Sequence, residues 1–531
     1  MPRRVSLFLL LIALAPLGCR PPSPRAERQA THQAVINLGT DPRTLDPSLA
    51  TDVASARALL FFQRGLFMLD DEGKPRPELA ESWEVSPDSR IYQIKLREAY
   101  WTNGQRVTAD DFLYTWTERV LNPEFGAEYA HQIYNYIAGA RAYYENPELG
   151  TETVRVWALA PDQLYVELEH PTPYFLELLA HHAYFPVCRA VDEQNADWAR
   201  RAETYVGCGP FVLAEYQPGA RIVARRNPQY WNAAAVKMEQ VTLRMIEEES
   251  TARIAFENGE IDATEGVPRA ELDSLRGSEA LAFSTAFSTY YLNLNCQKEP
   301  LRDVRVRRAL ALALNRREIT EKVTRAGEQP AFFISPPGLY EAPPAPTFAD
   351  ADFDEARRLL AEAGYPGGQG FPRLRYIYNM TDTHQLIAQV IQETWRRELG
   401  IEMTVENQEF KTLIENRRQG NFDVARAGWV ADFPDPLNFL EIFASDSDTN
   451  DSFWRDPAYD ALLFQARAET DPDTREAILR QADLYLIEQM PIVPIYIYST
   501  PYLRDPALEG FHLNPMAMFD PVRLAWRPPP S

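Results

Sequence analysis

Short apolar or alternating segments are interleaved with segments whose apolar residues recur every three or four positions. The first kind, which predicts β-strands, comprises 35–38, 91–96 and 401–405. The second kind, which predicts α-helices, comprises 108–120, 303–313, 354–363 and 385–399. Thr108 can cap the first helix with Asp111 at the capping-box position, and Gly364 and Gly400 end the last two helices. Strands that alternate with helices indicate an α/β fold.

The N-terminal segment has the pattern of a targeting signal. Arg3 and Arg4 precede an apolar run from 7 to 17, which is shorter than the ~20 residues of a membrane-spanning helix. Residues 1–18 are therefore predicted to be a secretory signal peptide. Gly18 and Cys19 resemble a bacterial lipobox, which predicts a lipidated Cys19 followed by a flexible leash over 19–33. Ordinary cleavage that leaves Cys19 as a thiol stays open as an alternative.

Length and charge limit the class of protein. The chain has 531 residues, which at about 100–200 residues per domain predicts three or four domains. Hydrophobic residues make up 45% and charged residues 24%, as in a globular protein. The formal net charge is −22 at pH 7. A field of this sign repels phosphate backbones, so nucleic acid is not expected as a partner.

Three cysteines follow Cys19, at positions 188, 208 and 296. In an oxidising compartment Cys188 and Cys208 would close a loop of about 20 residues, worth roughly 3 kcal/mol if bridged. A set of three buried thiols is the alternative, and both stay open. The sequence holds no CxxC pair and no Cys/His cluster with metal-ligand spacing, so we expect no metal and no cofactor.

Catalytic motifs are absent from the sequence. It contains no GxSxG, HExxH, P-loop or GxGxxG motif, and the seven histidines are scattered. The adjacent pair His181 and His182 would point apart on a helix or a strand. These observations favour a secreted binding protein over an enzyme. A hydrolase with paired carboxylates stays open, because 76 acidic residues will form chance pairs.

Several motifs resemble those of the family 5 extracytoplasmic solute-binding proteins of ABC importers. The matching segments are 45–47, 79–88, 94–98, 101–104, 107–112, 207–211, 226–231, 258–262, 303–309 and 362–364. The resemblance extends over about 35–525. Within the family, segments 406–412 and 420–432 are most similar to the oligopeptide-binding members.

The resemblance implies a two-lobed periplasmic-binding-protein fold, type II-like, with mixed sheets, an extra domain and hinge closure over the ligand. Lobe 1 (domain I) would comprise 34–63, 185–287 and 500–531, domain II would comprise 64–184, and lobe 2 (domain III) would comprise 288–499. The chain would cross between the lobes twice. The ligand would lie in the mouth between them.

The same resemblance assigns charged residues to the two ends of a peptide. Asp432 falls where the family's carboxylate binds the α-ammonium, and enclosing an ammonium without a partner would cost several kcal/mol. Arg426 falls at the position that meets the carboxylate of shorter peptides. Arg417 and His384 fall at positions that meet the carboxylate of longer ones. The pattern implies peptides of about three to four residues.

Backbone recognition would occur by strand addition, which gives affinity without regard to side chains. The residues expected beside the peptide backbone are Gly428, Trp429, Val430, Thr51 and Val53. The expected walls of the side-chain pockets are Trp429, Tyr290, Tyr291 and Asn293. The family's disulfide positions fall at Val430 and near Ser288, so that bridge is absent.

The sequence therefore predicts a non-enzymatic, monomeric receptor at the cell surface or in the periplasm. It would be lipid-anchored and deliver short peptides to the membrane subunits of an ABC permease. Two alternatives stay open. One keeps the fold but binds a cell-wall peptide, a metal complex or haem, and the other is a secreted hydrolase or chaperone-like protein.

Overall fold

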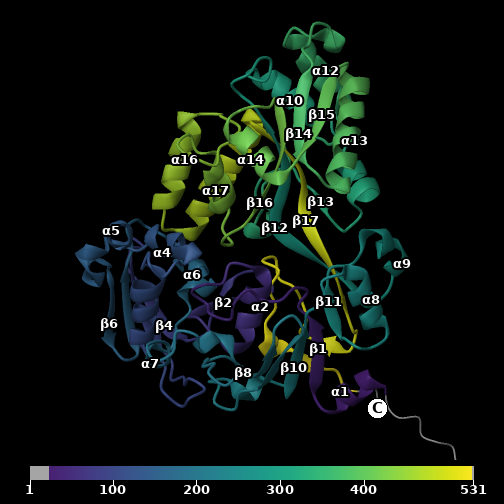
Figure 1. Ribbon diagram of the computed structural model, residues 1–531. Coiled ribbons are helices and arrows are strands. Elements are labelled where there is room, and N and C mark those ends of the chain that lie inside the picture. The colour runs from purple at the N-terminus through teal and green to yellow at the C-terminus, as the bar shows by residue number, and fades with distance from the viewer. Residues whose placement is uncertain (1–22, 529–531) are drawn as a thin grey trace, which may run out of the picture.

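Two long antiparallel strands, β12 (Leu281–Leu294) and β17 (Ile492–Arg504), run through both halves of the molecule (Figure 1). The computed structural model describes residues 23–528, so Cys19 and the expected signal peptide lie outside the described residues. Figure 1 shows an upper lobe, which holds β13–β16 and α10–α17, and a lower lobe, which holds β1–β11 and α1–α9. The two-lobed mixed α/β fold expected from the sequence is confirmed.

β12 and β17 form the centre of a mixed sheet of eleven strands. Its other strands in the upper lobe are β13 (Gln329–Pro330), β14 (Leu374–Asn379), β15 (Met403–Gln408) and β16 (Val424–Val430). Those in the lower lobe are β1 (Gln33–Asn37), β8 (Phe211–Gln217), β9 (Arg221–Arg226), β10 (Gln240–Arg244) and β11 (Ala263–Glu265). Because the hydrogen-bonded ladder passes from one lobe into the other, the two lobes share one backbone framework.

The ladder between β12 and β17 is interrupted where the lobes meet. Thr285 pairs with Ser499 and the next pair joins Thr289 to Ile497, so three residues of β12 stand opposite one residue of β17. Within this interruption the Phe287 N–H donates to Pro515 O at 2.9 Å and Phe287 O accepts from the Ala431 N–H at 2.9 Å. The irregularity is a position at which the sheet can bend.

Helices cover the upper part of the sheet. They are α10 (Val304–Leu312), α11 (Arg316–Glu318), α12 (Phe353–Glu362), α13 (Asp382–Leu399), α14 (Phe410–Arg418), α15 (Leu437–Leu440), α16 (Pro457–Ala468) and α17 (Pro472–Gln489). Asp303 caps α10 as expected, and Gly400 ends α13 in the left-handed region at φ 68°. Among residues 23–528 no helix has the length and apolarity to cross a bilayer.

The lower lobe carries a separate four-stranded sheet in the order β4-β5-β7-β6. Its strands are β4 (Ala80–Val85), β5 (Ile91–Leu96), β6 (Val156–Ala160) and β7 (Gln163–Glu167), and a hairpin of β2 (Phe67–Leu69) and β3 (Pro75–Pro77) lies apart from it. The helices of this lobe are α1 (Pro24–Ala30), α2 (Val53–Phe62), α3 (Ala109–Tyr114), α4 (His131–Tyr134), α5 (Ala140–Glu145), α6 (Phe175–Leu178), α7 (Arg189–Asp192), α8 (Glu249–Glu257) and α9 (Leu272–Leu275). The short strands β18 (Leu508–Glu509) and β19 (Ala525–Trp526) pair near the C-terminus.

The sequence placed α3 correctly. The capping box between Thr108 and Asp111 is formed, and the helix continues after Tyr114 as a π-helix over Thr115–Val120. Phe112 and Trp116 pack in the core of the lower lobe with no exposed surface. The helical spacing of the apolar residues therefore correctly indicated which face of the helix is buried.

Part of the leash expected over 19–33 is folded instead. Residues 24–30 form α1, whose Arg28 binds Asp262 through Nε at 2.8 Å and donates from Nη2 to Gly259 O at 2.8 Å. Arg25 donates to Phe256 O and Ile261 O, each at 2.8 Å. The two arginines satisfy carbonyl groups around the C-terminal end of α8, where positive charge is favoured. The leash prediction was wrong over this helix because composition does not reveal such a docking surface.

The disulfide considered between Cys188 and Cys208 is not formed, and Cys188, Cys208 and Cys296 are free buried thiols. The Cys208 thiol donates to Arg64 O at 3.7 Å, whereas the Cys188 thiol donates to Gln105 Oε1 at 3.4 Å. Each sulfur thus points to its own polar partner. Burial raises the pKa of Cys208 to about 12 and that of Cys296 to about 11.

We expect these thiols to be unreactive in the native protein, because the thiolate is the nucleophile and burial disfavours it. Treatment with dithionitrobenzoate followed by peptide mass mapping should leave Cys208 and Cys296 unmodified until guanidinium is added. A disulfide-linked peptide containing Cys188 and Cys208 in a non-reduced digest would contradict the structure.

A second contact between the lobes lies beside the crossing strands. Arg269, at the start of a turn preceding α9, donates to Glu328 Oε1 at 3.1 Å and to Thr324 O at 2.8 Å. The Glu328 side chain has no exposed surface, whereas 46% of the Arg269 side chain is exposed. Glu328 Oε2 also accepts from the Ala326 N–H at 2.7 Å. A buried carboxylate of the upper lobe therefore depends on a cation of the lower lobe.

The Arg269→Ala variant should be less stable by about 1–3 kcal/mol, because it leaves a buried carboxylate without its cation. Thermal unfolding of the ligand-free protein should show a midpoint lowered by several degrees relative to the wild type. Arg396→Ala is the matched control, since Arg396 pairs with Glu393 at 2.8 Å and both side chains are half exposed. Equal midpoints for the two variants would count against this role of Glu328.

Candidate functional site

Asp432 follows the C-terminal end of β16. The Asp432 backbone N–H and the Trp429 indole N–H both donate to Asn438 Oδ1, at 3.1 and 3.0 Å, which fixes the turn. The Asp432 side chain is open to solvent on one side. Surrounding protein still desolvates it, and this burial raises the pKa of its carboxyl against the opposing effect of Asn438 and His131. Among residues 23–528 no Lys or Arg acts on this carboxylate.

Across from Asp432 lies Tyr129 of the lower lobe. Burial raises the pKa of the Tyr129 phenol, and the negative charges of Asp432, Glu128 and Asp52 raise it further. Glu128 is paired with Arg43 at 3.0 Å, and Asp52 caps α2 by accepting from the Ser55 N–H at 2.8 Å. Unlike Glu128, the Asp432 carboxylate has no ion-pair partner among the described residues.

A group of imidazoles lies beside Tyr129. The rings of His181 and His182 are 4.2 Å apart between centroids, and the Tyr129 ring is 4.8 Å from that of His181. The expectation that the two histidines point apart was wrong, because His181 Nδ1 caps a short turn by accepting from the Ala183 N–H at 3.2 Å. Burial lowers the pKa of His182 to about 4, so this wall is uncharged at neutral pH. The sequence offered no signal for this cluster.

β16 has a free edge next to Asp432. It pairs with β12 along its whole length, from Val424 to Val430, whereas it pairs with β14 only at Val424 and Ala425. Among the described strands, none covers the second edge of β16 beyond Ala425. Val430 is 69% exposed there. An unpaired row of backbone N–H and C=O groups can hydrogen-bond an extended peptide.

Arg426 lies on this part of β16, six residues before Asp432. Its Nη2 donates to the Tyr498 hydroxyl at 2.7 Å, and its guanidinium lies 5.1 Å from the centre of the Tyr290 ring. Its Nε is buried and has no hydrogen-bond partner among the described residues. None of the charges acting on Arg426 is a carboxylate. A largely desolvated cation without a counter-ion is a site for an anion.

His384, at the start of α13, is buried near Arg426. Its Nδ1–H donates to Asn379 O at 3.1 Å, so in the neutral ring Nε2 carries a lone pair. Burial, followed by the charges of Arg426 and Arg269, lowers the pKa of His384 to about 4. The ligand-free ring is therefore uncharged at neutral pH, and its contact with a peptide carboxylate stays a prediction.

Arg417 already has an anionic partner. Its Nε and Nη2 both contact Asp451 Oδ2, at 2.8 and 2.5 Å. No pattern in the sequence indicates Asp451 as this partner. Of the three groups assigned to peptide carboxylates, Arg426 is therefore the one that is charged at neutral pH and has no ion-pair partner among the described residues.

The expected pocket walls occupy both faces of β12. Tyr290 stacks on Tyr496 with 4.8 Å between ring centres, and Tyr291 packs edge-on against Phe443 at 5.8 Å. Both tyrosines are buried, as the core alternative to a pocket role would require. Asn293 is also buried, and its amide nitrogen and oxygen have no partner among the described residues.

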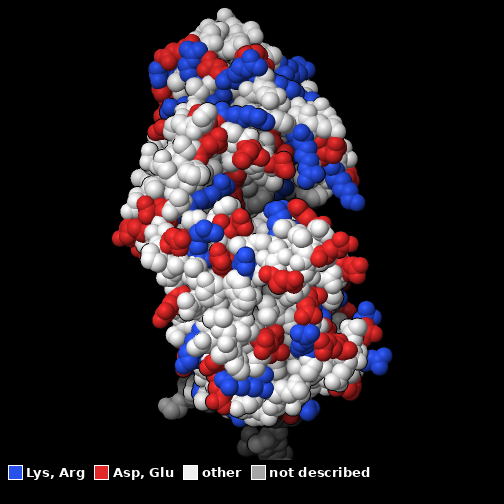
Figure 2. Space-filling model, turned by 90° about the vertical axis from the view of Figure 1, so that its left-hand side faces the viewer, with Lys and Arg blue, Asp and Glu red and all other residues white. Residues whose placement is uncertain are grey.

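Residues expected on the lower lobe lie at the start of α2. Val53 is the first residue of that helix and is 49% exposed. The Thr51 hydroxyl accepts from Arg43 Nη1 at 3.0 Å. Thr51 is partly exposed and Val53 is exposed beside the Asp52 cap. Figure 2 shows the opening between the lobes as a hollow in the surface, with charges of both signs around it.

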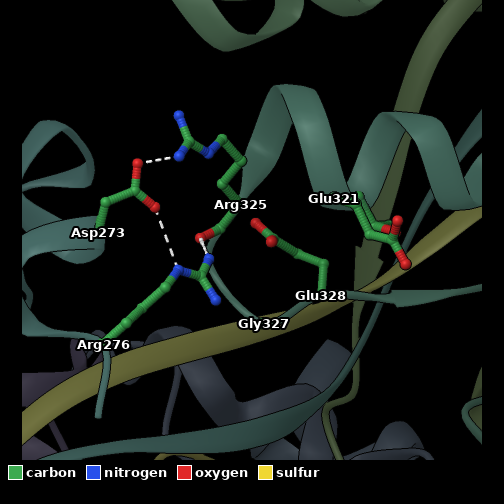
Figure 3. Close-up of a pocket in the computed structure, with 7 residues that line it drawn as sticks. Asp273, Arg276, Glu321, Arg325, Gly327 and Glu328 are labelled. Carbon is green, nitrogen blue, oxygen red and sulfur yellow. Dashed lines mark hydrogen bonds and ion pairs between the residues drawn. The ribbon is translucent and has the colours of Figure 1, made fainter. Parts of the chain in front are cut away.

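A separate pocket lies at the contact between α9 and the upper lobe (Figure 3). It has a volume of about 500 Å³. In Figure 3 Asp273 stands between Arg276 and Arg325, and both arginines pair with it. The Arg276 side chain also donates to Arg325 O at 3.0 Å. These charges compensate one another, so this pocket lacks the unpaired groups found at Asp432 and Arg426. Within residues 23–528 no cluster of three His, Cys, Asp or Glu has the geometry to hold a metal ion.

Two lobes joined by crossing strands, with a free strand edge and unpaired charges in the opening, define a receptor that binds its ligand between lobes. The family model of the bacterial extracellular solute-binding proteins, family 5, matches residues 74–451. The chain belongs to this family, as the sequence motifs indicated.

Several relatives cover nearly the whole chain. The oligopeptide-binding protein OppA of Bacillus subtilis is 33% identical over 489 residues, which are 90% of this chain and 89% of the relative. The structure of Haemophilus influenzae OppA in complex with the peptide RPPGFSPFR is 31% identical, with a TM-score of 0.69 over 94% of this chain and 99% of the other.

The arrangement of the lobes resembles an open form. The structure of the periplasmic murein tripeptide-binding protein MppA in its unliganded open form has a TM-score of 0.87, at 33% identity over 93% of this chain and 97% of the other. A second structure, of the Escherichia coli murein tripeptide-binding protein MppA, has a TM-score of 0.71 at the same identity, over 93% and 98%. The opening described above therefore resembles that of the unliganded open form of MppA.

Proposed function

We propose that this protein is the extracytoplasmic receptor of an ABC importer and binds short peptides by their two charged ends and their backbone. One observation carries the proposal: among the described residues neither the Asp432 carboxylate nor the Arg426 guanidinium has an ion-pair partner, and the two groups lie at and just beyond the free edge of β16. A zwitterionic, extended ligand satisfies all three features together. Relatives named for oligopeptide binding support the same conclusion.

Each charged end of the peptide would meet a group of opposite charge. The α-ammonium would pair with Asp432, near the neutral wall of Tyr129 and the histidines. The carboxylate would pair with Arg426, which Tyr290 and Tyr498 hold in place. Backbone groups between the ends would hydrogen-bond β16. These contacts involve no ligand side chain, so they suit a receptor for peptides of varied sequence.

We further propose that Cys19 is lipidated and tethers the mature chain to the membrane, beside the permease. Docking of α1 onto Asp262 would leave only the residues before it as the tether. The domain limits proposed from the resemblance are domain I at 34–63, 185–287 and 500–531, domain II at 64–184, and domain III at 288–499. The two changes of lobe then fall in β12 and β17, close to the interruption of their ladder.

The Asp432→Asn variant should bind trialanine about 100-fold more weakly than the wild type, because the peptide ammonium loses its only carboxylate partner. Isothermal titration at neutral pH measures the dissociation constants. Asp448→Asn is the matched control: it removes the same charge from an exposed position of the same lobe. Equal affinities of Asp432→Asn and the wild type would overturn the assignment of the ammonium site.

Binding should weaken in acid through Asp432. The pKa of its carboxyl is raised in the ligand-free protein, and a bound ammonium lowers it, so the peptide favours the deprotonated form. Affinity is therefore complete above the raised pKa and falls as the pH drops through it. Titrations of trialanine between pH 7.5 and 4 should show this loss in the wild type and a flat profile in Asp432→Asn. A flat wild-type profile would contradict the role of Asp432.

A further inference from the structure

The ion pair between Arg417 and Asp451 is nearly closed to solvent. Arg417 lies in the last turn of α14 and Asp451 in the loop before α16. Only 12% of the Arg417 side chain and 9% of the Asp451 side chain are exposed. Two guanidinium nitrogens converge on one carboxylate oxygen. The pair is therefore a neutral, well-bonded unit that is not exchanging freely with water.

This pair lies near the Tyr291 phenol, on the side of the sheet away from the Tyr290 ring that Arg426 contacts. Tyr291 of β12 lies opposite Ala427, the neighbour of Arg426 on β16. Burial raises the pKa of Tyr291 to about 12, and the charges of Arg417, Asp451 and Arg426 all act on the same phenol. A peptide carboxylate at Arg417 would thus also come close to Asp451. Two carboxylates sharing one cation in a desolvated place repel each other.

The remaining group, His384, offers no charge to a peptide carboxylate in the ligand-free protein at neutral pH. His384 is uncharged there, and its Nδ1–H is committed to Asn379 O, so Nε2 presents a lone pair. A lone pair facing a carboxylate gives no hydrogen bond. Arg426 differs from both groups, since it keeps its charge, has a free Nε–H and faces no carboxylate among the described residues.

We propose that Asp451 sets the preferred length of the peptide: by neutralising Arg417 it removes the anchor for longer peptides and leaves Arg426 as the carboxylate site. The inference rests on the proposed function and specifies its substrate class as the shorter peptides, here tripeptides over tetrapeptides. Asp451 itself contacts no part of the peptide. It acts through Arg417 and is a positioning residue.

The test compares trialanine with tetraalanine by isothermal titration at pH 7.5. The wild type should bind trialanine at least tenfold more tightly. Asp451→Asn keeps the size of the side chain but frees the charge of Arg417, so the affinity for tetraalanine should rise about tenfold while that for trialanine stays within twofold. The double variant R417Q/D451N replaces the pair by two uncharged amides and should restore the wild-type preference.

The variants separate a change in specificity from damage to the fold. A misfolded Asp451→Asn protein would lose affinity for both peptides, whereas a gain for one peptide alone requires a freed anchor. The double variant removes both charges, so neither is left buried alone, and it keeps the inference testable if the single variant is unstable. Thermal unfolding midpoints of all three proteins check that each is folded.

Three results would overturn the inference. One is an unchanged ratio of the two affinities in Asp451→Asn. Another is a tenfold loss of tetraalanine binding in R417Q/D451N, which would mean that Arg417 holds the carboxylate in spite of Asp451. The third is absence of binding of both peptides to the wild type, which would overturn the proposed function as well. Trialanine binding that persists while the ratio stays fixed would leave the proposed function standing and remove only the role of Asp451.

Discussion

The shared ladder of β12 and β17 is the constraint on which the molecule depends. Backbone hydrogen bonds join these strands in both lobes, so neither lobe has a complete sheet without them. The ladder is interrupted between Thr285 and Thr289, and there Phe287 forms backbone hydrogen bonds to both lobes. The opening lies beside a connection that is continuous in sequence but locally unpaired. A receptor that closes on a ligand needs two rigid lobes and a flexible connection between them.

Charge pairing explains how the site stands out from the rest of the protein. Several buried ions elsewhere have a counter-ion, as Arg475 has Asp435 at 2.7 Å and Arg64 has Asp520 at 2.9 Å, whereas the buried Arg307 is bonded by backbone carbonyl groups. Such partners are required because an isolated buried ion costs several kcal/mol. Arg426 on β16 and Asp432, two residues after the end of that strand, have no ion-pair partner among the described residues. In the proposed function a zwitterionic peptide would supply both missing charges.

Local patterns in the sequence identified the elements but not their contacts. The alternation at 91–96 and the capping box at Thr108 depend on neighbouring residues, so the sequence displays them directly. The rings of His181 and His182 meet because of a turn, which strand or helix periodicity could not reveal. Docking of α1 on Asp262 joins residues more than 200 positions apart. The spacing of Cys188 and Cys208 allowed a bridge, yet each thiol has a different neighbour in space.

The sequence by itself determined the α/β class and the family, and through the family resemblance it assigned residues to the ends of a peptide, an assignment that stays a prediction. These conclusions rest on short-range patterns and on motifs that are read along the chain. Only the tertiary structure decided which of those residues are chemically free. Arg426, Arg417 and His384 read alike as cations in sequence, whereas folding leaves the first unpaired, gives the second Asp451 and discharges the third. The reason is physical: charge state and pairing depend on burial and on partners that are distant in the chain.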